Sequence, residues 1–440
     1  MLAMWPYHPD LLATAVPRYT SYPTAAEFGD GVGAEDHARA LGSVAGEVSL
    51  YVHIPFCEKI CWYCGCNTST ANRPGRVASY LDALHREIAL VGARLPSWAR
   101  VGRVAFGGGS PNAIQPIDFV RLLDLLTLHF RLTDPVLSIE IDPRMFSPDW
   151  VEVLAGSRIT RASLGVQTTA PHLQRAIGRV QPEADIARTV EGLRKAGVQS
   201  LNFDLMYGLP GQSQADLTAT LDFSRAQDAD RIALFGYAHV PHLIARQRKI
   251  ADDALPGQAE RFAMAAHGYE QLSEAGYVPV GFDHFARPGD PLAMATVNGR
   301  LHRNFQGFTD DAAPVLVGLG ASAISQFPDL LIQNEKNTGR YRMMLSQDRL
   351  PASRGIGRNA QDRERAAIIE ALLCTGQARV DPVLLQAAQP RLAPFVERGL
   401  VVIRPGEIVF APTALPYARS IAAQFDGYRE ASPQRFSSAV

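Results

Sequence analysis

Six short apolar segments, each followed by a stretch with helical periodicity, restrict most strongly what this chain can fold into. We expect strands at 49–54, 103–109, 137–142, 161–167, 200–208 and 231–237. Helices are expected at 77–94, 117–130, 182–196 and 213–226, where apolar residues recur at helical spacing. Repeated strand-then-helix units predict a parallel sheet with right-handed crossovers. The expected fold class is therefore α/β, an incomplete parallel (β/α)6 barrel.

Several of the expected strands end in glycine or polar residues. The sequences at these ends are "GGGS", "EID", "GVQ" and "DLMYG". Parallel barrels and open α/β sheets carry their sites at the carboxyl ends of the strands. The site is therefore expected at that edge of the sheet.

The regions on either side of the alternating segments differ from them in pattern. Residues 1–45 lack regular periodicity and are expected to wrap the barrel, which with its extension would occupy 46–345. Residues 346–440 show two helices followed by helix, strand, turn and strand, which predicts a small winged-helix-like domain. Such modules often bind DNA, but this one carries no basic run, which favours a role in packing or as a lid.

The overall charge excludes several classes of partner. With 440 residues, 47% of them hydrophobic, and a formal net charge of -1, the chain has ample core material and no global field to attract nucleic acid. No apolar run is long enough to cross a bilayer, and the first 20 residues lack the pattern of a signal peptide. A cytoplasmic, monomeric protein without a membrane span is expected.

Four of the five cysteines lie in "CEKICWYCGC", residues 57–66. A disulfide framework would distribute even-numbered cysteines through a small secreted domain, so metal or redox chemistry is the better interpretation. The fifth, Cys374, lies in the apolar stretch "AAIIEALLC" and is expected to be a buried, inert thiol. His53, which precedes the cysteines, is either a core histidine or a hydrogen-bond donor near the site.

The spacing C-x3-C-x2-C of Cys57, Cys61 and Cys64 suits three corners of a 4Fe-4S cube, leaving one iron open to another ligand. A zinc site, the alternative, would need a fourth ligand at a recognised spacing, and no such partner follows in the sequence. Cys66 is the additional thiol of the segment. It is expected not to bind iron, although its position two residues after Cys64 leaves it as an alternative ligand.

The cysteine spacing after the first strand, Tyr63 before the third cysteine, and "GGGSP" at 107–111 together resemble the radical S-adenosylmethionine superfamily. In that family the open iron binds S-adenosylmethionine, and an electron from the cluster cleaves it to give a 5'-deoxyadenosyl radical. Longer stretches narrow the resemblance to the oxygen-independent coproporphyrinogen III oxidases. They include "PRYTSYPTA", "LYVHIPFC", "CGCN", "SIEIDPR", "NFDLMYGLPGQ", "YAHVP", "DHFARP", "LHRNFQG" and "GASAIS".

This resemblance implies a cluster held by Cys57, Cys61 and Cys64 and two molecules of S-adenosylmethionine. It assigns the first molecule to Tyr51, Gly108, Glu140 and Ile324. It assigns the second to Tyr63, Gly109, Ser110, Gln167, Arg179, Asp204 and Ala238. Cys66 is then a catalytic candidate that shapes the pocket or transfers a proton or hydrogen atom.

The implied reaction is the oxidative decarboxylation of two propionates of coproporphyrinogen III to vinyl groups, giving protoporphyrinogen IX without dioxygen. An electron donor such as flavodoxin or ferredoxin would be required. The substrate propionates need cationic partners, for which the candidates are Arg18, Arg246, Lys249, Arg287 and Arg303.

The chain departs from the usual pattern of these oxidases at Asn112, Thr168 and Gly236, where the family commonly has other residues. These departures leave two alternatives open. One is a related radical enzyme that acts on haem or another substrate by methyl or radical transfer. The other is a non-catalytic haem chaperone on the same barrel, against which "CGCN" and "PRYTSYPTA" argue.

Overall fold

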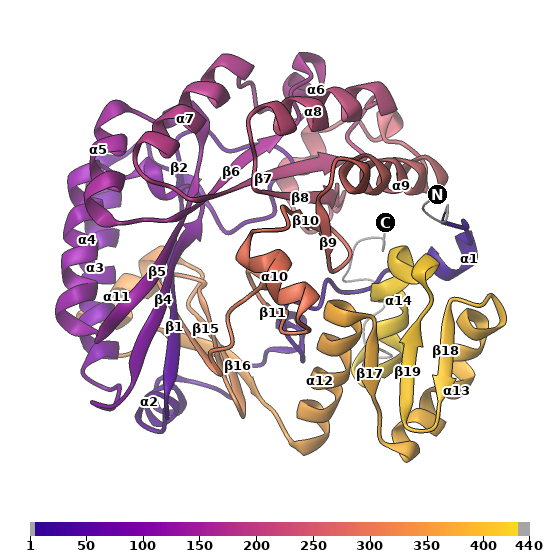
Figure 1. Ribbon diagram of the computed structural model, residues 1–440. Coiled ribbons are helices and arrows are strands. Elements are labelled where there is room, and N and C mark those ends of the chain that lie inside the picture. The colour runs from indigo at the N-terminus through magenta and orange to yellow at the C-terminus, as the bar shows by residue number, and fades with distance from the viewer. Residues whose placement is uncertain (1–4, 430–440) are drawn as a thin grey trace.

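The computed structural model describes residues 5–429 and is built around one large curved sheet (Figure 1). Six of its strands are parallel and adjacent: β1 (Glu47–Ile54), β4 (Arg100–Gly108), β5 (Leu132–Ile141), β6 (Arg161–Gln167), β7 (Ser200–Tyr207) and β8 (Arg231–Gly236). All six expected strands are confirmed, most of them to within three residues at either end. The exception is β5, which begins five residues earlier than predicted because "LTDPV" pairs with β4 before the apolar run starts.

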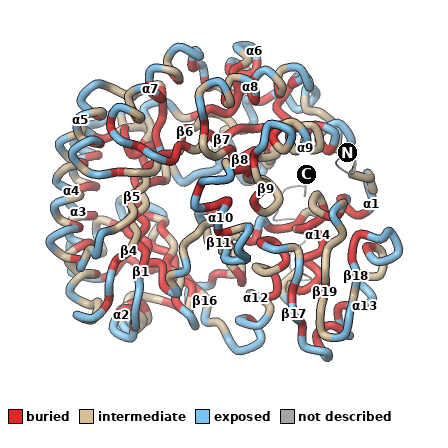
Figure 2. Tube along the Cα trace, viewed as in Figure 1, coloured by how far each residue is buried: buried red, intermediate tan, exposed pale blue. Residues whose placement is uncertain are grey.

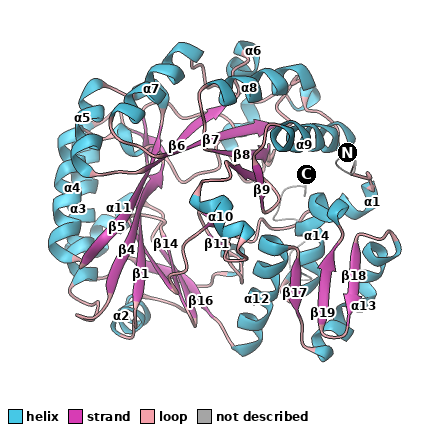
Figure 3. Ribbon diagram, in the orientation of Figure 1, coloured by secondary structure: helices cyan, strands magenta, loops and turns pink. Residues whose placement is uncertain are grey.

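Helices cover the outer face of these strands (Figure 3). They are α3 (Pro74–Gly92), α4 (Pro116–His129), α5 (Pro148–Ser157), α6 (Pro171–Ala176), α7 (Glu183–Lys195), α8 (Gln214–Ala226) and α9 (Gln258–Glu274). The expected apolar face of α3 is buried from Tyr80 to Val91. Proline at the first turn fits α3, α4 and α5, because its missing N–H would have no partner there.

The sheet continues beyond the six parallel strands at both edges. On one side β13 (Val315–Leu319) runs parallel to β1 and is followed by three antiparallel strands, β14 (Ile324–Phe327), β15 (Leu330–Asn334) and β16 (Ala352–Gly357). On the other side β10 (His284–Ala286) and β9 (Val278–Val280) add two short antiparallel strands. Between the edges lie α10 (Pro291–Val297) and the hairpin β11 (His302–Asn304) and β12 (Gly307–Thr309).

The parallel register brings the carboxyl ends of the central strands to one edge. Ile54 is paired with Gly108, and Tyr207 with Gly236. Buried residues concentrate along the strands, whereas residues of the outer turns are mostly exposed (Figure 2). The loops that follow the strands therefore start from a rigid core and converge at this edge.

The terminal regions contact each other. The C-terminal elements are α11 (Thr338–Ser346), α12 (Ala360–Thr375), β17 (Gln377–Arg379), α13 (Pro382–Glu397), β18 (Val401–Arg404), β19 (Glu407–Phe410) and α14 (Ala418–Ala422). Near the N-terminus lie α1 (Pro9–Leu12) and α2 (Ala34–Gly42), and the Tyr19 hydroxyl donates to Asp426. Cys374 is buried in α12, as expected, and burial raises its pKa to about 12. Among residues 5–429, no helix is both long and apolar enough to span a membrane.

Candidate active site

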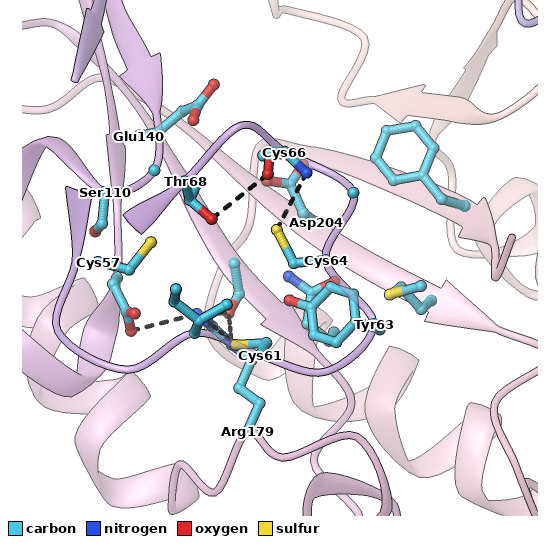
Figure 4. Close-up of a pocket in the computed structure, with 18 of the residues that line it drawn as sticks. Cys57, Cys61, Tyr63, Cys64, Cys66, Thr68, Ser110, Glu140, Arg179 and Asp204 are labelled. Carbon is cyan, nitrogen blue, oxygen red and sulfur yellow. Dashed lines mark hydrogen bonds and ion pairs between the residues drawn. The ribbon is translucent and has the colours of Figure 1, made fainter. Parts of the chain in front are cut away.

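The cysteine-rich loop leaves β1 and lies across the carboxyl edge of the sheet. It is anchored at its start by β2 (Phe56–Cys57), which pairs with β3 (Ser69–Thr70). Cys61 is buried, Cys57 and Cys64 are partly buried, and Cys66 is exposed. All four line one cavity of about 420 Å³. Figure 4 shows the sulfurs of the first three cysteines around the interior of the loop.

The arrangement of these thiols fits a cluster better than a single ion. Within the described part of the chain, no three His, Cys, Asp or Glu side chains gather as one metal ion would require. Thiolates that hold different corners of a 4Fe-4S cube are more widely spaced than the ligands of one tetrahedral zinc. Cys57, Cys61 and Cys64 are therefore suited to hold such a cluster.

Two arginines surround the sulfur of Cys61. Nη1 of Arg179 lies 3.3 Å from it, and Nη2 of Arg144 lies 3.5 Å from it. Both arginines also contact Asp142, at 3.3 Å and 2.6 Å respectively. Burial raises the pKa of Asp142, but the charges of the two arginines outweigh this and hold it below its usual range. The result is a fixed, net positive environment beside the thiol of Cys61.

Arg179 lines the cavity and also contacts the cysteine-rich loop through the sulfur of Cys61. It lies in the turn after α6, and its Nε and Nη2 donate to the carbonyl of Gly165. Arg179 and Cys61 are both buried, so this contact holds the cysteine-rich loop against the turn after α6.

Two carboxyl groups face the cavity, Glu140 from β5 and Asp204 from β7, the strands on either side of β6. Oε2 of Glu140 accepts from the Gly108 amide at 3.1 Å. Burial and the charge of Asp204 raise the pKa of Glu140 to about 7. Asp204 accepts from Ser163 and Asn202, both at 2.8 Å, and burial raises its pKa as well. The pair can accept hydrogen bonds from ammonium or hydroxyl groups of a ligand.

Gly108 shows why glycine is needed at the end of β4. Its φ is +113°, a conformation that side chains rarely adopt. A Cβ there would lie 2.4 Å from the ring of His53. His53 is buried, and its Nδ1 forms a hydrogen bond with the Tyr51 hydroxyl. Burial lowers the pKa of His53 to about 4. The histidine is therefore a neutral core residue that supports the glycine-rich turn from behind.

The structure brings together most of the residues that the resemblance implied. Those that line the cavity are Tyr63, Gly108, Gly109, Ser110, Glu140, Gln167, Arg179, Asp204 and Ala238, together with the four cysteines. Tyr51 and Ile324 are not among the residues that line it. Tyr51 is buried in a small apolar cluster with Leu316 and Ala323, behind the turn at Gly108.

Several residues of the site were not predicted. Asp142 and Arg144 lie in "EIDPR", and acid–base neighbours of this kind are usually surface residues. Gln247 donates to the carbonyls of Tyr63 and Ala238 at 2.8 Å and 3.0 Å, so it ties the cysteine loop to the end of β8. A carboxylate directly after a buried strand is a signal that could have identified Asp142. The sequence around Gln247 contains no comparable signal.

Two of the three departures from the family pattern are explained by packing. Asn112 is buried, bonds to both the N–H and the carbonyl of Asp142, and accepts from Ser110 at 2.6 Å. Thr168 is buried and accepts from the amide of Ala170. Neither lines the cavity. Asn112 and Thr168 therefore pack behind the residues that line the cavity and do not contact its interior.

The five cationic candidates differ in their positions. Arg18 lines the cavity, and Arg246 holds the loop by donating to Thr68 and to the carbonyl of Cys66. Lys249 lies 5.6 Å over the ring of Trp62. Arg303 lies outside the cavity lining and donates to the carbonyl of Arg18.

The position of Arg287 removes it from the candidates for binding the substrate propionates. It pairs with Asp228 at 2.5 Å and lies over Tyr277, outside the cavity. It follows β10, which runs antiparallel to β8, so it lies away from the carboxyl ends of the parallel strands.

Comparisons with known proteins agree with this geometry. The model of the radical SAM superfamily matches residues 51–224. An oxygen-independent coproporphyrinogen III oxidase from Bradyrhizobium diazoefficiens is 40% identical over 437 residues, covering 97% of each chain. Its counterpart from Escherichia coli is 36% identical, covering 96% of each chain. The solved structure of coproporphyrinogen III oxidase from Escherichia coli, described as a radical SAM enzyme, superposes with a TM-score of 0.90 over 97% of this chain and 100% of that chain, at 34% identity.

The matched cysteine loop and strands place the chain in a class of enzymes that combine an iron–sulfur cluster with S-adenosylmethionine. Within that class, it belongs to the family of the oxygen-independent coproporphyrinogen III oxidases.

Proposed function

We propose that this protein converts coproporphyrinogen III to protoporphyrinogen IX by oxidative decarboxylation of two propionates, without dioxygen. The observation that carries the proposal is the meeting of Cys57, Cys61 and Cys64 with the carboxyl groups of Glu140 and Asp204 in one cavity, in a chain that matches the family over nearly its full length. When bound, the cluster and S-adenosylmethionine supply a carbon radical that removes a hydrogen atom from the propionate.

The residues of this chain bind and orient the reactants. We propose that Glu140 accepts from the methionine ammonium of the first S-adenosylmethionine and that Asp204 accepts from a hydroxyl group of the second. The fixed partners of both carboxylates, Gly108 for Glu140 and Ser163 and Asn202 for Asp204, support this assignment because they leave further acceptor positions toward the cavity. The remaining residues assigned to the two molecules are those given above, including Tyr51 and Ile324.

The apolar part of the cavity would keep water away from the reacting carbon. Met206, Phe235 and Ile244 line it beside the cysteine loop. Stray hydrogen-atom donors such as thiols quench a carbon radical, so an apolar wall without such groups at this point favours productive transfer. Loss of carbon dioxide then leaves the vinyl group, with one electron passing to an acceptor.

We also propose the finer organisation expected from the sequence. The six parallel strands and their helices would form an incomplete (β/α)6 barrel within 46–345, with 1–45 wrapping it and 346–440 as a winged-helix-like domain. The protein would act as a monomer and receive electrons from flavodoxin or ferredoxin. The hydrogen bond from Arg18 to the carbonyl of Gly236, at the end of β8, supports the wrapping role of the first segment.

An anaerobic assay tests the proposed function. The reconstituted protein is mixed with coproporphyrinogen III, a reductant and S-adenosylmethionine, and protoporphyrinogen formation is followed. The number of S-adenosylmethionine molecules bound per chain is measured on the same sample. Protoporphyrinogen and two bound molecules are expected. Absence of product with an intact cluster would overturn the proposed reaction, and one bound molecule would overturn the second cofactor site.

A further inference from the structure

A second cavity lies between the curved sheet and the β11–β12 hairpin. This inner cavity has a volume of about 240 Å³. Four of its residues also line the cavity that contains the cysteines, namely Glu140, Ser163, Asp204 and Phe235. Gln306 in the hairpin lines the inner cavity and is exposed, so this space reaches the protein surface. Glu140 and Asp204 therefore have a second route to the surface, which no residue of the cysteine-rich loop lines.

The inner cavity is suited to hold water. Oδ1 of Asn202 and Nη2 of Arg231 are buried and have no hydrogen-bond partner among residues 5–429. Both residues line the inner cavity, and buried polar atoms of this kind are normally bonded to water. The volume accommodates several molecules, since one water takes roughly 30 Å³. Hydrogen-bonded water can therefore connect Asp204 with the surface beside the hairpin.

The other carboxylates and arginines that line the inner cavity form ion pairs. They are Arg103 and Arg161 with Asp310, Arg103 with Asp311, and Arg231 with Asp290, at 2.8 to 3.5 Å. Carboxylates held in ion pairs stay ionised, and arginine does not release its proton near neutral pH. Among the described residues that line the inner cavity, this leaves His284, Glu140 and Asp204 to exchange protons in that range.

His284 lies on β10 and is oriented by its neighbour in the sequence. Its Nδ1 lies 2.7 Å from a carboxylate oxygen of Asp283. Burial raises the pKa of Asp283, but His284, Arg303 and Arg18 outweigh burial and hold it below its usual range. An ionised carboxylate only accepts, so Nδ1 donates to it, and Nε2 of the neutral ring is left as an acceptor. Nε2 has no hydrogen-bond partner within residues 5–429.

The strand register places His284 in line with Asp204. Ala233 on β8 is paired with Asp204 on β7 and with His284 on β10. Residues paired in this way point to the same face of a sheet, and strands two apart are separated by roughly 10 Å. Phe235 and Phe308 hold the imidazole edge-on, each with its ring centroid 5.4 Å away. Burial raises the pKa of Asp204, and the nearby imidazole opposes that rise. Water in the inner cavity can therefore bridge the two side chains.

The proposed function requires a proton acceptor at this place. It puts Glu140 beside the ammonium of the first S-adenosylmethionine. An amino group binds a metal through its lone pair, so an ammonium loses one proton when it becomes a ligand. Burial and the charge of Asp204 raise the pKa of Glu140 to about 7, so this carboxyl can hold a proton near neutral pH. With cofactor and substrate in the cavity that contains the cysteines, the inner cavity leaves a route from Glu140 to water.

We propose that the inner cavity is a proton path in which His284, oriented by Asp283, carries the proton released by S-adenosylmethionine binding from Glu140 and Asp204 to the surface. The inference rests on the proposed function. The N–H bond of the ammonium breaks, its nitrogen keeps the electron pair, and the proton passes to Glu140. It then moves over Asp204 and water to Nε2 of His284 and leaves to solvent beside the hairpin. No electron is transferred in these steps.

Proton release on binding of S-adenosylmethionine tests the path without turnover. Cluster-loaded protein without reductant is mixed with S-adenosylmethionine in weak buffer at neutral pH, and a pH-sensitive dye is followed by anaerobic stopped flow. The wild type should release about one proton per chain, because only the molecule that binds iron loses one. His284→Gln should release the same amount at least about tenfold more slowly. Asp283→Asn should slow release less, because it keeps the imidazole and removes the carboxylate that orients it.

His267→Gln is the matched control, since His267 is a partly buried histidine that bonds to Thr218 outside both cavities. It should leave the rate of proton release unchanged. All variants should retain their iron and the amount of S-adenosylmethionine that they bind. Added imidazole should restore the rate in His284→Ala without changing that of the wild type, a rescue that a packing defect would not show.

Two results would overturn the proton path alone. One is release at the wild-type rate in both His284→Gln and Asp283→Asn, and the other is slow release in His284→Ala that imidazole does not restore. A wild type that binds S-adenosylmethionine and forms protoporphyrinogen without releasing a proton on binding would also contradict it. A wild type that neither binds S-adenosylmethionine nor forms protoporphyrinogen would overturn the proposed function and the proton path together.

Discussion

The guanidinium of Arg179 lies 3.3 Å from the sulfur of Cys61 and 3.3 Å from a carboxylate oxygen of Asp142. A hydrogen bond and a positive charge at a cluster thiolate favour the reduced, more negative cluster. We predict that Arg179→Gln lowers the reduction potential by about 60 mV, a tenfold change for one electron. The reduction potential is measured by potentiometric titration followed by electron paramagnetic resonance.

Arg175→Gln, an exposed arginine on α6, is the control for this prediction and should leave the potential unchanged. Equal potentials in wild type and Arg179→Gln would show that the contact with Cys61 does not persist in the cluster-loaded protein.

The buried hydrogen bonds of Asn112 lead to a prediction about stability. Replacing Asn112 by Leu removes three hydrogen bonds, one from Ser110 and two with the backbone of Asp142. The N–H and the carbonyl of Asp142 are then left unpaired. We expect the free energy of unfolding to fall by about 2–3 kcal/mol, because unpaired buried polar groups carry their full desolvation cost. Urea unfolding measures it, with the exposed Asn298→Leu as control. A loss no greater than that of the control would contradict the bridging role.

The structure also predicts a pH dependence that centres on Glu87 in α3. This carboxyl is fully buried and accepts from Tyr341, Asn334 and the Gly320 amide. Burial raises its pKa to about 7 from the usual 4.5. The folded protein therefore keeps the proton to a higher pH than the unfolded chain. This contribution to stability is complete below about pH 4.5 and is lost as the pH rises through about 7.

Comparison with Glu87→Gln isolates this contribution. Between about pH 5 and about pH 8, the free energy of unfolding of the wild type should fall by roughly 2 kcal/mol relative to that of the variant. Urea unfolding of the cluster-free protein at the two pH values measures this difference. The exposed Glu191→Gln should show no such trend. A constant difference between wild type and Glu87→Gln would mean that Glu87 is ionised throughout.

Local pattern was sufficient for the parallel strands, because each is a short apolar run followed by an amphipathic helix. The carboxyl-edge location of Glu140 and Asp204 followed from the same pattern. The contacts of Arg179 and Arg261 could not be predicted in this way. Arg261 lies in "ERFAMAAHGYE", where an arginine on an amphipathic helix is indistinguishable from a solvated one. Only the packing of α9 beside β7 and β8 brings it behind Gly236.

Cys66 lies directly beside a proposed cluster ligand, since its backbone N–H donates to the sulfur of Cys64 at 3.4 Å. Its carbonyl accepts from Arg246, so the backbone at this position is held independently of the thiol. Serine would preserve both contacts and remove the soft donor. We therefore predict that Cys66→Ser assembles a normal 4Fe-4S cluster and loses at least about tenfold in turnover, the scale of a lost proton-transfer group.

Iron content and the cluster spectrum with and without S-adenosylmethionine check the first part of this prediction, and the anaerobic assay checks the second. Cys64→Ser is the matched control, because it removes a thiol two residues away that we assign to iron. It should fail to assemble the cluster, since three protein thiolates are needed to hold the cube while one iron stays open. If Cys64→Ser builds a cluster and Cys66→Ser does not, the third ligand is Cys66, and the spacing C-x3-C-x2-C does not define the site.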